Sequence, residues 1–290
     1  MGGGRWTEEA FDEYAIGSWG ISGKEAEKAR MSTQQVFRKM RLSNVLNPYE
    51  VTRTCHDSEE HPNTVPVILA LDVTGSMGAA AVKTATGLNK IITEIFRSGK
   101  VRDVEFCVMG IGDLHYDNAP IQISQFESDI RIAEQMDEIW FEGGGGGNVF
   151  ESYTAAWYMG TRHCDLDCWK RGRKGLILTL GDELPNPYLS AAELKAVTGD
   201  SLQADIETES LLEETQKKYE IYHFSVNDNQ SSYRRNQERN NLDGAWSQLL
   251  GKDHYRVVTI DSLAGEVSGI IERFACAGDQ KNGPIAPHLW

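Results

Sequence analysis

The chain has 290 residues, of which 29 are Lys or Arg and 43 are Asp or Glu, so its formal net charge is −14. This acidic balance argues against nucleic acid and anionic membranes as partners, because both are bound through basic patches. The hydrophobic share of 40% is ordinary for a folded soluble protein.

The cysteines and the hydropathy pattern give an expectation about location. The five cysteines form an odd set without the spacings of a disulfide framework, which is typical of a reducing compartment. The sequence has no run of about 20 apolar residues that could cross a bilayer. Residues 1–14 also lack the apolar core of a signal peptide. We therefore expect a cytoplasmic protein without a membrane partner.

The chain divides into three parts by its patterning. Residues 1–62 are polar and weakly patterned, and we interpret them as an N-terminal extension that is partly helical, with a short helix at Thr33–Met40. Residues 63–277 carry the regular strand and helix signals of one domain. Residues 278–290 contain glycine and prolines, which predict an irregular C-terminal tail.

Within the domain, strand and helix signals alternate along the chain. Short continuous apolar runs predict strands that are buried on both faces, and these cover residues 65–71, 104–111, 175–180, 221–226 and 255–260. An alternating pattern predicts an edge strand at 121–126. Helices are expected at 82–98 (ended by Gly99), 130–140, 151–159, 190–218 and 262–275, with an exposed loop at 227–241. The alternation predicts an α/β fold with a doubly wound, mostly parallel sheet flanked by helices.

Polar residues gather where these strands end. They are Asp72-Val73-Thr74-Gly75-Ser76, Gly112-Asp113, the glycine run 143–147 with Asn148 and Glu151, and Gly181-Asp182. In open α/β sheets ligands bind outside the carboxyl ends of the strands. Carboxylates brought together there are costly unless their charge is compensated. Because Mg²⁺ prefers oxygen ligands and keeps several waters, a hard divalent cation is the expected ligand.

The first of these clusters carries a family resemblance. The pattern Asp72-x-Thr74-x-Ser76 after a buried strand resembles the metal-ion-dependent adhesion site (MIDAS) of von Willebrand factor type A (VWA) domains, which reads Asp-x-Ser-x-Ser. Thr74 keeps the hydroxyl of the first Ser. The run from Thr74 to Met77 is similar to a bacterial or phage-type branch of that family. The resemblance covers residues 65–276 and implies a Rossmann-like VWA fold.

The resemblance also implies a set of metal ligands. In the family, a Thr from a second loop and an Asp from a third complete the site; Asp182 matches the third element. Asn148, after the glycine run, occupies the second position and brings an amide oxygen without charge. The implied ligands of Mg²⁺ or Mn²⁺, with Ca²⁺ as an alternative, are Asp72, Thr74, Ser76, Asn148 and Asp182. The residues expected around them are Asp113, Glu151 and Ser152.

These residues also have plainer interpretations. Asp72, Thr74 and Ser76 are residue types that cap a following helix. An acidic residue such as Glu151 is favoured in the first turn of a helix by the helix dipole. A zinc site at His163, Cys164 and Cys168 is disfavoured, because no second pair of ligands has suitable spacing.

The function expected from the resemblance is a metal-dependent protein-binding module. Such a module is a scaffold or regulatory component of a multi-protein complex, in which the ion binds a partner's Asp or Glu; an AAA+ ATPase is one implied partner. No nucleophile–base pair is evident, so catalysis is not expected. One alternative is a haloacid-dehalogenase-like, Mg²⁺-dependent phosphohydrolase with Asp72 as nucleophile and Lys174 as its lysine, although Thr74 stands where a second Asp is usual. The other is a structural component of a larger assembly with a vestigial metal site.

Overall fold

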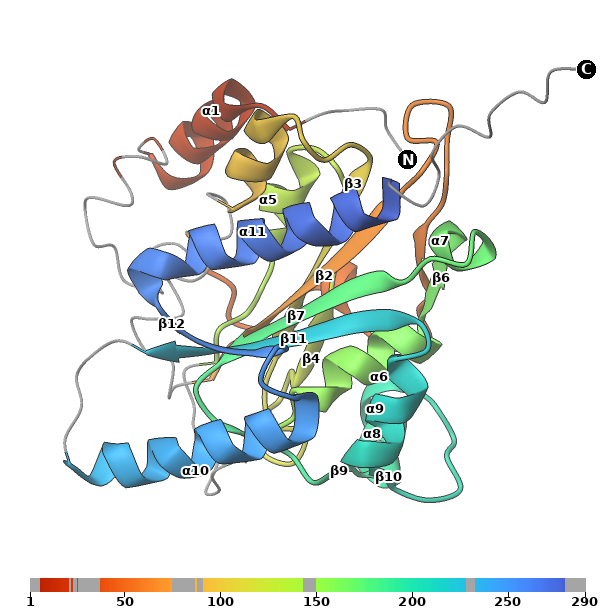
Figure 1. Ribbon diagram of the computed structural model, residues 1–290, viewed down its shortest axis with the longest axis vertical. Helices are drawn as coiled ribbons and strands as arrows, with labels where there is room; N and C mark the ends of the chain where they lie inside the picture. Colours follow the sequence, from red (N-terminus) through yellow and green to blue (C-terminus); the bar gives the residue numbers. More distant parts are fainter. Residues whose placement is uncertain are drawn as a thin grey trace, which may run out of the picture.

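The computed structural model describes residues 6–20, 22, 25, 37–74, 87, 91–142, 150–227 and 233–279 (Figure 1). Within these residues the main sheet has six strands in the order β12-β11-β7-β2-β3-β4. Their bounds are β2 (Val65–Asp72), β3 (Val104–Ile111), β4 (Ile121–Ile123), β7 (Gly175–Gly181), β11 (Tyr219–Asn227) and β12 (Tyr255–Thr259). Each strand coincides with a predicted one to within a few residues.

The sheet is parallel except at one edge. Every neighbouring pair is parallel apart from β3 and β4, which are antiparallel. Strands β2, β3 and β7 are buried along their whole length, because helices cover both faces of a parallel sheet and apolar side chains are then favoured on both. The predicted doubly wound, mostly parallel α/β fold is confirmed, with the short β4 at the edge.

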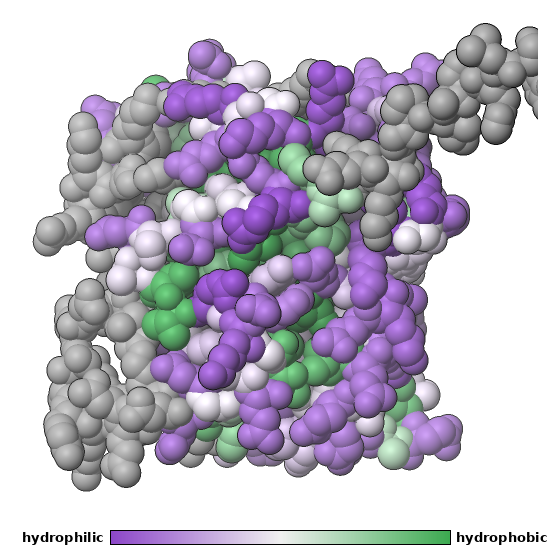
Figure 2. Space-filling view, viewed as in Figure 1, coloured by the Kyte–Doolittle hydropathy of each residue, from purple (hydrophilic) through white to green (hydrophobic). Residues whose placement is uncertain are grey.

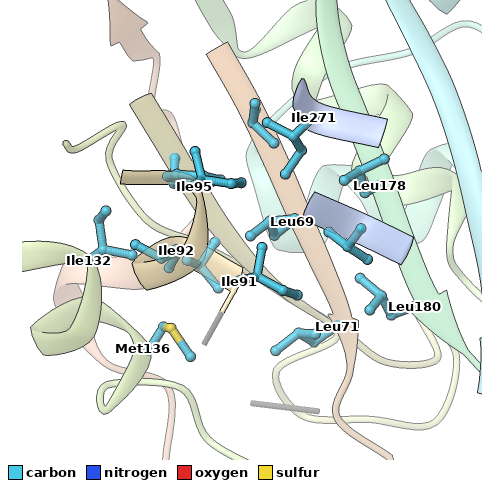
Figure 3. Close-up of a cluster of buried hydrophobic side chains, with 14 of the residues drawn as sticks. Leu69, Leu71, Ile91, Ile92, Ile95, Ile132, Met136, Leu178, Leu180 and Ile271 are labelled. Carbon is cyan, nitrogen blue, oxygen red and sulfur yellow. The ribbon is translucent and has the colours of Figure 1, made fainter. Parts of the chain in front are cut away.

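Side chains of β2 alternate between two apolar layers. Leu69 and Leu71 pack on one face, together with the helix at 91–98, α5 (Arg131–Met136) and α11 (Ile260–Asp279) (Figure 3). Ile68 and Ala70 pack on the other, against α6 (Thr154–Arg162) and α9 (Thr208–Thr215). Burying each large aliphatic side chain contributes about 1.5–3 kcal/mol, so the two layers stabilise the sheet.

The described part of the N-terminal region packs on this body. Helix α1 (Glu8–Trp19) begins at Thr7, whose hydroxyl accepts from the Ala10 N–H. Trp6 lies in the same apolar layer as Leu69, and its indole N–H donates to the Thr93 hydroxyl at 3.0 Å. Further along, β1 (Arg53–Cys55) pairs in parallel with β6 (Cys164–Leu166). Part of the helix expected at 33–40 lies outside the described residues, and 37–40 is not helical.

One predicted loop is wrong. Residues 233–241, expected in an exposed loop, belong to α10 (Tyr233–Leu250). The apolar face of this helix is carried by Leu242, Trp246 and Leu250, which are buried at a spacing of four. The stretch before these residues is rich in Asn and Arg, and its composition predicts a loop rather than a helix.

The remaining elements connect the layers. The polar zone expected to be helical at 190–218 is divided into α8 (Ala191–Thr198) and α9, and Gly199 (φ +86°) ends α8. The short elements are η1 (Asn44–Leu46), α7 (Asp167–Lys170), and the two-stranded pairs β5 (Phe150–Glu151) with β8 (Leu184–Pro185) and β9 (Tyr188–Leu189) with β10 (Ile206–Glu207). In the part of the chain that the structure covers, no helix has both the length and the apolar character needed to cross a bilayer. On the face seen in Figure 2, apolar side chains lie in separate areas among polar ones.

Candidate metal centre

The order of the strands defines where a ligand would bind. From β2 the chain continues to β3 on one side, and after β4 it crosses to β7 on the other side of β2. Ligands of open α/β sheets bind at such a switch point, outside the carboxyl ends of the strands. Asp72 is the last residue of β2, and Asp182 follows directly after β7. The structure therefore places the first and third predicted elements on the two strands that flank the switch point.

The carboxylate of Asp72 is buried and held by three donors. Its side chain is 1% exposed. The backbone N–H and the hydroxyl of Thr74 donate to Oδ1 at 2.9 and 2.5 Å. The hydroxyl of Tyr153 donates to Oδ2 at 2.6 Å. None of the ion pairs formed within the described residues involves Asp72, so in that part of the chain neutral donors stabilise its charge.

Tyr153 is a site residue that sequence reasoning missed. Its hydroxyl oxygen also accepts from the Glu183 N–H at 3.2 Å, so the ring bridges the ends of β2 and β7. A Cβ added to Gly181 would lie 2.0 Å from this hydroxyl oxygen, so the close approach requires glycine. The available signal was a tyrosine close after the glycine run, together with a glycine at the end of a buried strand.

Acidic side chains gather near Asp72 at this edge of the sheet. Burial, and after it the nearby charge of Asp182, raises the pKa of Asp72 to about 7. Glu151 is 5% exposed, and its Oε2 accepts no hydrogen bond from the residues that the structure describes. Burial, and then the charge of Asp72, raises the pKa of Glu151 to about 9. A buried carboxylate oxygen without a donor is costly, and a cation at this edge would remove that cost.

The loop after β3 joins the same edge. The hydroxyl of Ser152 accepts from the Leu114 N–H at 3.0 Å, which fixes the loop to the segment after β5. Asp113 is buried, accepts from the His115 N–H at 2.7 Å, and is among the charges that raise the pKa of Glu151. Asp113 and Ser152 thus lie around the centre, where they order its loops.

The predicted site is described only in part. Ser76 and Asn148 lie outside the described residues. Glu151 was expected in the first turn of a helix, but it lies in β5, because the backbone of β5 pairs with β8. Across the described residues, no three His, Cys, Asp or Glu side chains come close enough together to hold a metal ion. The oxygen donors and the unpartnered Glu151 Oε2 nevertheless have the chemistry that a hard cation requires.

Two residues considered for other chemistries lie away from this edge. Lys174 precedes β7 at its amino end, and Asp182 follows at the carboxyl end. The ring of His163 is hydrogen-bonded through Nε2 to the Asp200 carboxylate at 2.6 Å and through Nδ1 to the Val51 carbonyl oxygen at 2.9 Å. All five cysteines are described, and each is a free thiol.

The comparisons with known proteins concern the fold. No protein-family model matches the sequence, and no curated protein matches it. The open-conformation structure of the pilus adhesin SpaC from Lactobacillus rhamnosus GG is similar, with 14% identity over 79% of this chain and 31% of that chain and a TM-score of 0.50. The present chain therefore spans less than a third of the SpaC chain.

Two further structures are similar at lower scores. The vWF domain of the type V pili tip protein Mfa5 from Porphyromonas gingivalis has 11% identity over 74% of this chain and 96% of that chain, with a TM-score of 0.45. BatB from Bacteroides thetaiotaomicron has 16% identity over 73% and 99%, with a TM-score of 0.43. Strand order confirms the predicted doubly wound α/β fold class, and the likeness to SpaC shows that the chain shares its fold with part of that structure.

Proposed function

We propose that this chain is a divalent-cation-dependent protein-binding module. Asp72, Thr74 and Asp182 would hold Mg²⁺ or Mn²⁺, with Ser76 and Asn148 supplying further oxygens from loops outside the described residues. A partner's Asp or Glu would then bind to the ion. The observation that carries the proposal is the buried carboxylate of Asp72 at the switch point, which has acidic neighbours and, among the described residues, neutral hydrogen-bond donors.

The charge balance explains why the ion would matter for binding. With Asp72 and Asp182 ionised, the edge repels an approaching carboxylate. A bound divalent cation reverses the local charge and offers a position that water or a partner's oxygen can take. A charge-assisted contact of this kind fixes the register of a complex, while the surrounding surface supplies much of the affinity.

The wider setting that we propose rests on the sequence and on its resemblance to the VWA family. We propose a cytoplasmic scaffold or regulatory role in a multi-protein complex, with an AAA+ ATPase as one candidate partner. The VWA-like fold supports an interaction module as the general class. The partner would be recognised by an acidic side chain in a loop that can reach the carboxyl ends of β2 and β7.

Calorimetric titration of the metal-stripped chain with Mg²⁺ and Mn²⁺ tests the site. We expect binding to the unmodified chain, and its loss in Asp72→Ala and Asp182→Ala. Asp261→Ala is the matched control, because Asp261 is exposed at the start of α11 and should leave binding unchanged. Retention of full affinity in both site variants would show that the ion is held elsewhere or not by these residues.

The same titration addresses the two alternatives. A folded chain that binds neither ion, yet assembles with a partner in EDTA, would favour a structural component with a vestigial site. The phosphohydrolase is disfavoured because Lys174 lies at the opposite end of β7. Mg²⁺-dependent hydrolysis of an aryl phosphate that disappears in Asp72→Asn would reinstate it.

A further inference from the structure

A tryptophan from α10 contacts the loop that carries Asp182. This residue lies between Gly181, the last residue of β7, and Glu183. The indole N–H of Trp246 donates to the backbone carbonyl of Glu183 at 3.1 Å. The hydroxyl of Tyr153 accepts from the backbone N–H of Glu183 at 3.2 Å. Both backbone polar groups of Glu183 are thus bonded to side chains from other parts of the chain.

The Trp246 ring is itself held in place. It is fully buried and stacks on the imidazole of His223, with ring centroids 3.6 Å apart and an interplanar angle of 7°. His223 on β11 is paired in register with Thr179 on β7, and its Nδ1 is hydrogen-bonded to the Thr179 hydroxyl at 2.8 Å. Leu242 and Leu250, about one turn away on either side along α10, are also buried. The sheet and the packing of α10 therefore set the position of the indole donor.

These contacts fix the backbone on both sides of Asp182. Gly181 belongs to β7, so the sheet holds the residue before Asp182. The residue after it, Glu183, is bonded at its N–H and its carbonyl, and β8 then pairs with β5. A side chain on a backbone fixed in this way loses little freedom when it binds an ion. Trp246, 63 residues further along the chain, is the contribution of α10 to this arrangement.

We propose that Trp246 is a positioning residue of the candidate metal centre: its indole N–H fixes the Glu183 carbonyl and so holds Asp182 in place for the cation. The inference rests on the proposed function and makes the affinity of the centre depend on α10. Hydrogen bonds that orient metal ligands typically account for about 10–100-fold in metal affinity. Loss of the indole N–H should therefore weaken cation binding although no ligand is removed.

The first test removes the donor and keeps an aromatic ring. Mg²⁺ is titrated by calorimetry into metal-stripped Trp246→Phe, at a temperature where urea unfolding in EDTA shows that the variant is folded. We expect binding about tenfold weaker than in the unmodified chain. A merely structural role would lower the unfolding midpoint and leave the affinity of the folded chain unchanged. Unchanged affinity would overturn the proposal.

Trp157→Phe is the matched control for this substitution. Trp157 lies on α6 and is fully buried, and within the described residues its Nε1 has no hydrogen-bond partner. The control therefore removes the same atoms from the same kind of environment without breaking a hydrogen bond. We expect its affinity for Mg²⁺ to match that of the unmodified chain. An equal loss of affinity in Trp157→Phe and Trp246→Phe would overturn the proposal.

A second variant covers the case in which Trp246→Phe does not fold. Benzothienylalanine is incorporated at position 246, where its ring keeps nearly the size of indole and carries sulfur in place of the N–H. We expect this analogue to fold and to lose about as much affinity as the loss of an orienting hydrogen bond predicts, again about tenfold. Full affinity with the analogue would mean that ring packing alone positions Asp182, and would overturn the proposal.

The unmodified chain and Asp182→Ala separate this inference from the proposed function. If the unmodified chain binds neither Mg²⁺ nor Mn²⁺, the proposed function fails, and the role of Trp246 fails with it. If the unmodified chain binds the ions, Asp182→Ala does not, and both changes at position 246 leave the affinity unaltered, the proposed function stands and the role of Trp246 alone is refuted. The expected pattern is loss in Asp182→Ala and weakening by both changes at position 246.

Discussion

Replacing Asp72 by Asn removes a charge that the fold buries among other acids. In the metal-free chain the pKa of Asp72 is raised from 3.8 to about 7. Its ionisation therefore costs roughly 4 kcal/mol of stability at pH 8, since one pH unit corresponds to about 1.4 kcal/mol. Because the folded-state pKa is raised, the protonated acid stabilises the fold fully below pH 3.8, and this contribution is lost as the pH rises through about 7.

Asparagine avoids the ionisation but changes one hydrogen bond. Its Oδ1 can still accept from Thr74, whereas an amide N–H₂ would replace the oxygen that accepts from the Tyr153 hydroxyl. The lost acceptor costs about 1–3 kcal/mol, at every pH. The stability of Asp72→Asn relative to the unmodified chain should therefore improve by about 2–3 kcal/mol between pH 5 and pH 8, whatever the size of that fixed cost.

Urea unfolding in EDTA at pH 5, 6, 7 and 8 measures this difference. Asp261→Asn is the matched control, because Asp261 is exposed and its substitution should have a small effect that does not depend on pH in this range. Adding Mg²⁺ should then stabilise the unmodified chain and not Asp72→Asn, by mass action on the folded state. A difference that stays constant from pH 5 to pH 8 would refute the electrostatic reasoning.

Three further substitutions test the packing around the centre. Gly181→Ala should destabilise the chain by about 1–3 kcal/mol or more in urea unfolding, because the new Cβ meets the Tyr153 hydroxyl. The control, Gly244→Ala, lies in open space on α10 and should be neutral or up to about 1 kcal/mol stabilising. An equal loss of stability in the two variants would contradict the geometry. Tyr153→Phe should cost about 1–2 kcal/mol at pH 8 by removing a donor to a buried carboxylate, and an unchanged unfolding midpoint would show that this bond contributes nothing. Trp246→Ala should lower stability by about 3–5 kcal/mol, because the ring is fully buried and stacked on His223. A loss below about 1 kcal/mol in thermal unfolding would mean that the apolar layer around Trp246 repacks.

The strands were predictable because their signals are local. Val65–Asp72 and Val104–Ile111 are apolar runs bounded by polar residues, so their ends could be read to within a residue. Once a parallel sheet was inferred, its carboxyl edge followed, and with it the meeting of Asp72 and Asp182 across the switch point. The hydroxyl and carboxylate groups at that edge indicate a hard cation by their chemistry alone.

The parts that could not be predicted depend on distant partners. Glu151 was assigned to a helix because the residues after it have helical composition, but it pairs as a strand with Pro185. The role of Tyr153 depends on the exact approach of Gly181, which no local pattern encodes. Trp6 joins the core through a residue on the helix at 91–98, far along the chain. Tertiary packing decided each of these positions.

The aromatic wall behind Tyr153 has a consequence for how the centre would respond to a ligand. The Tyr153 ring lies 5.1 Å from His223 and 5.7 Å from Trp246, edge to face, and rests on Gly181. A ring confined on these sides leaves its hydroxyl little freedom to swing, so the Asp72 carboxylate is preorganised during folding. Little conformational entropy of the Asp72 side chain would then be lost when a cation binds. Affinity at this edge would then depend on charge rather than on the cost of ordering the Asp72 side chain.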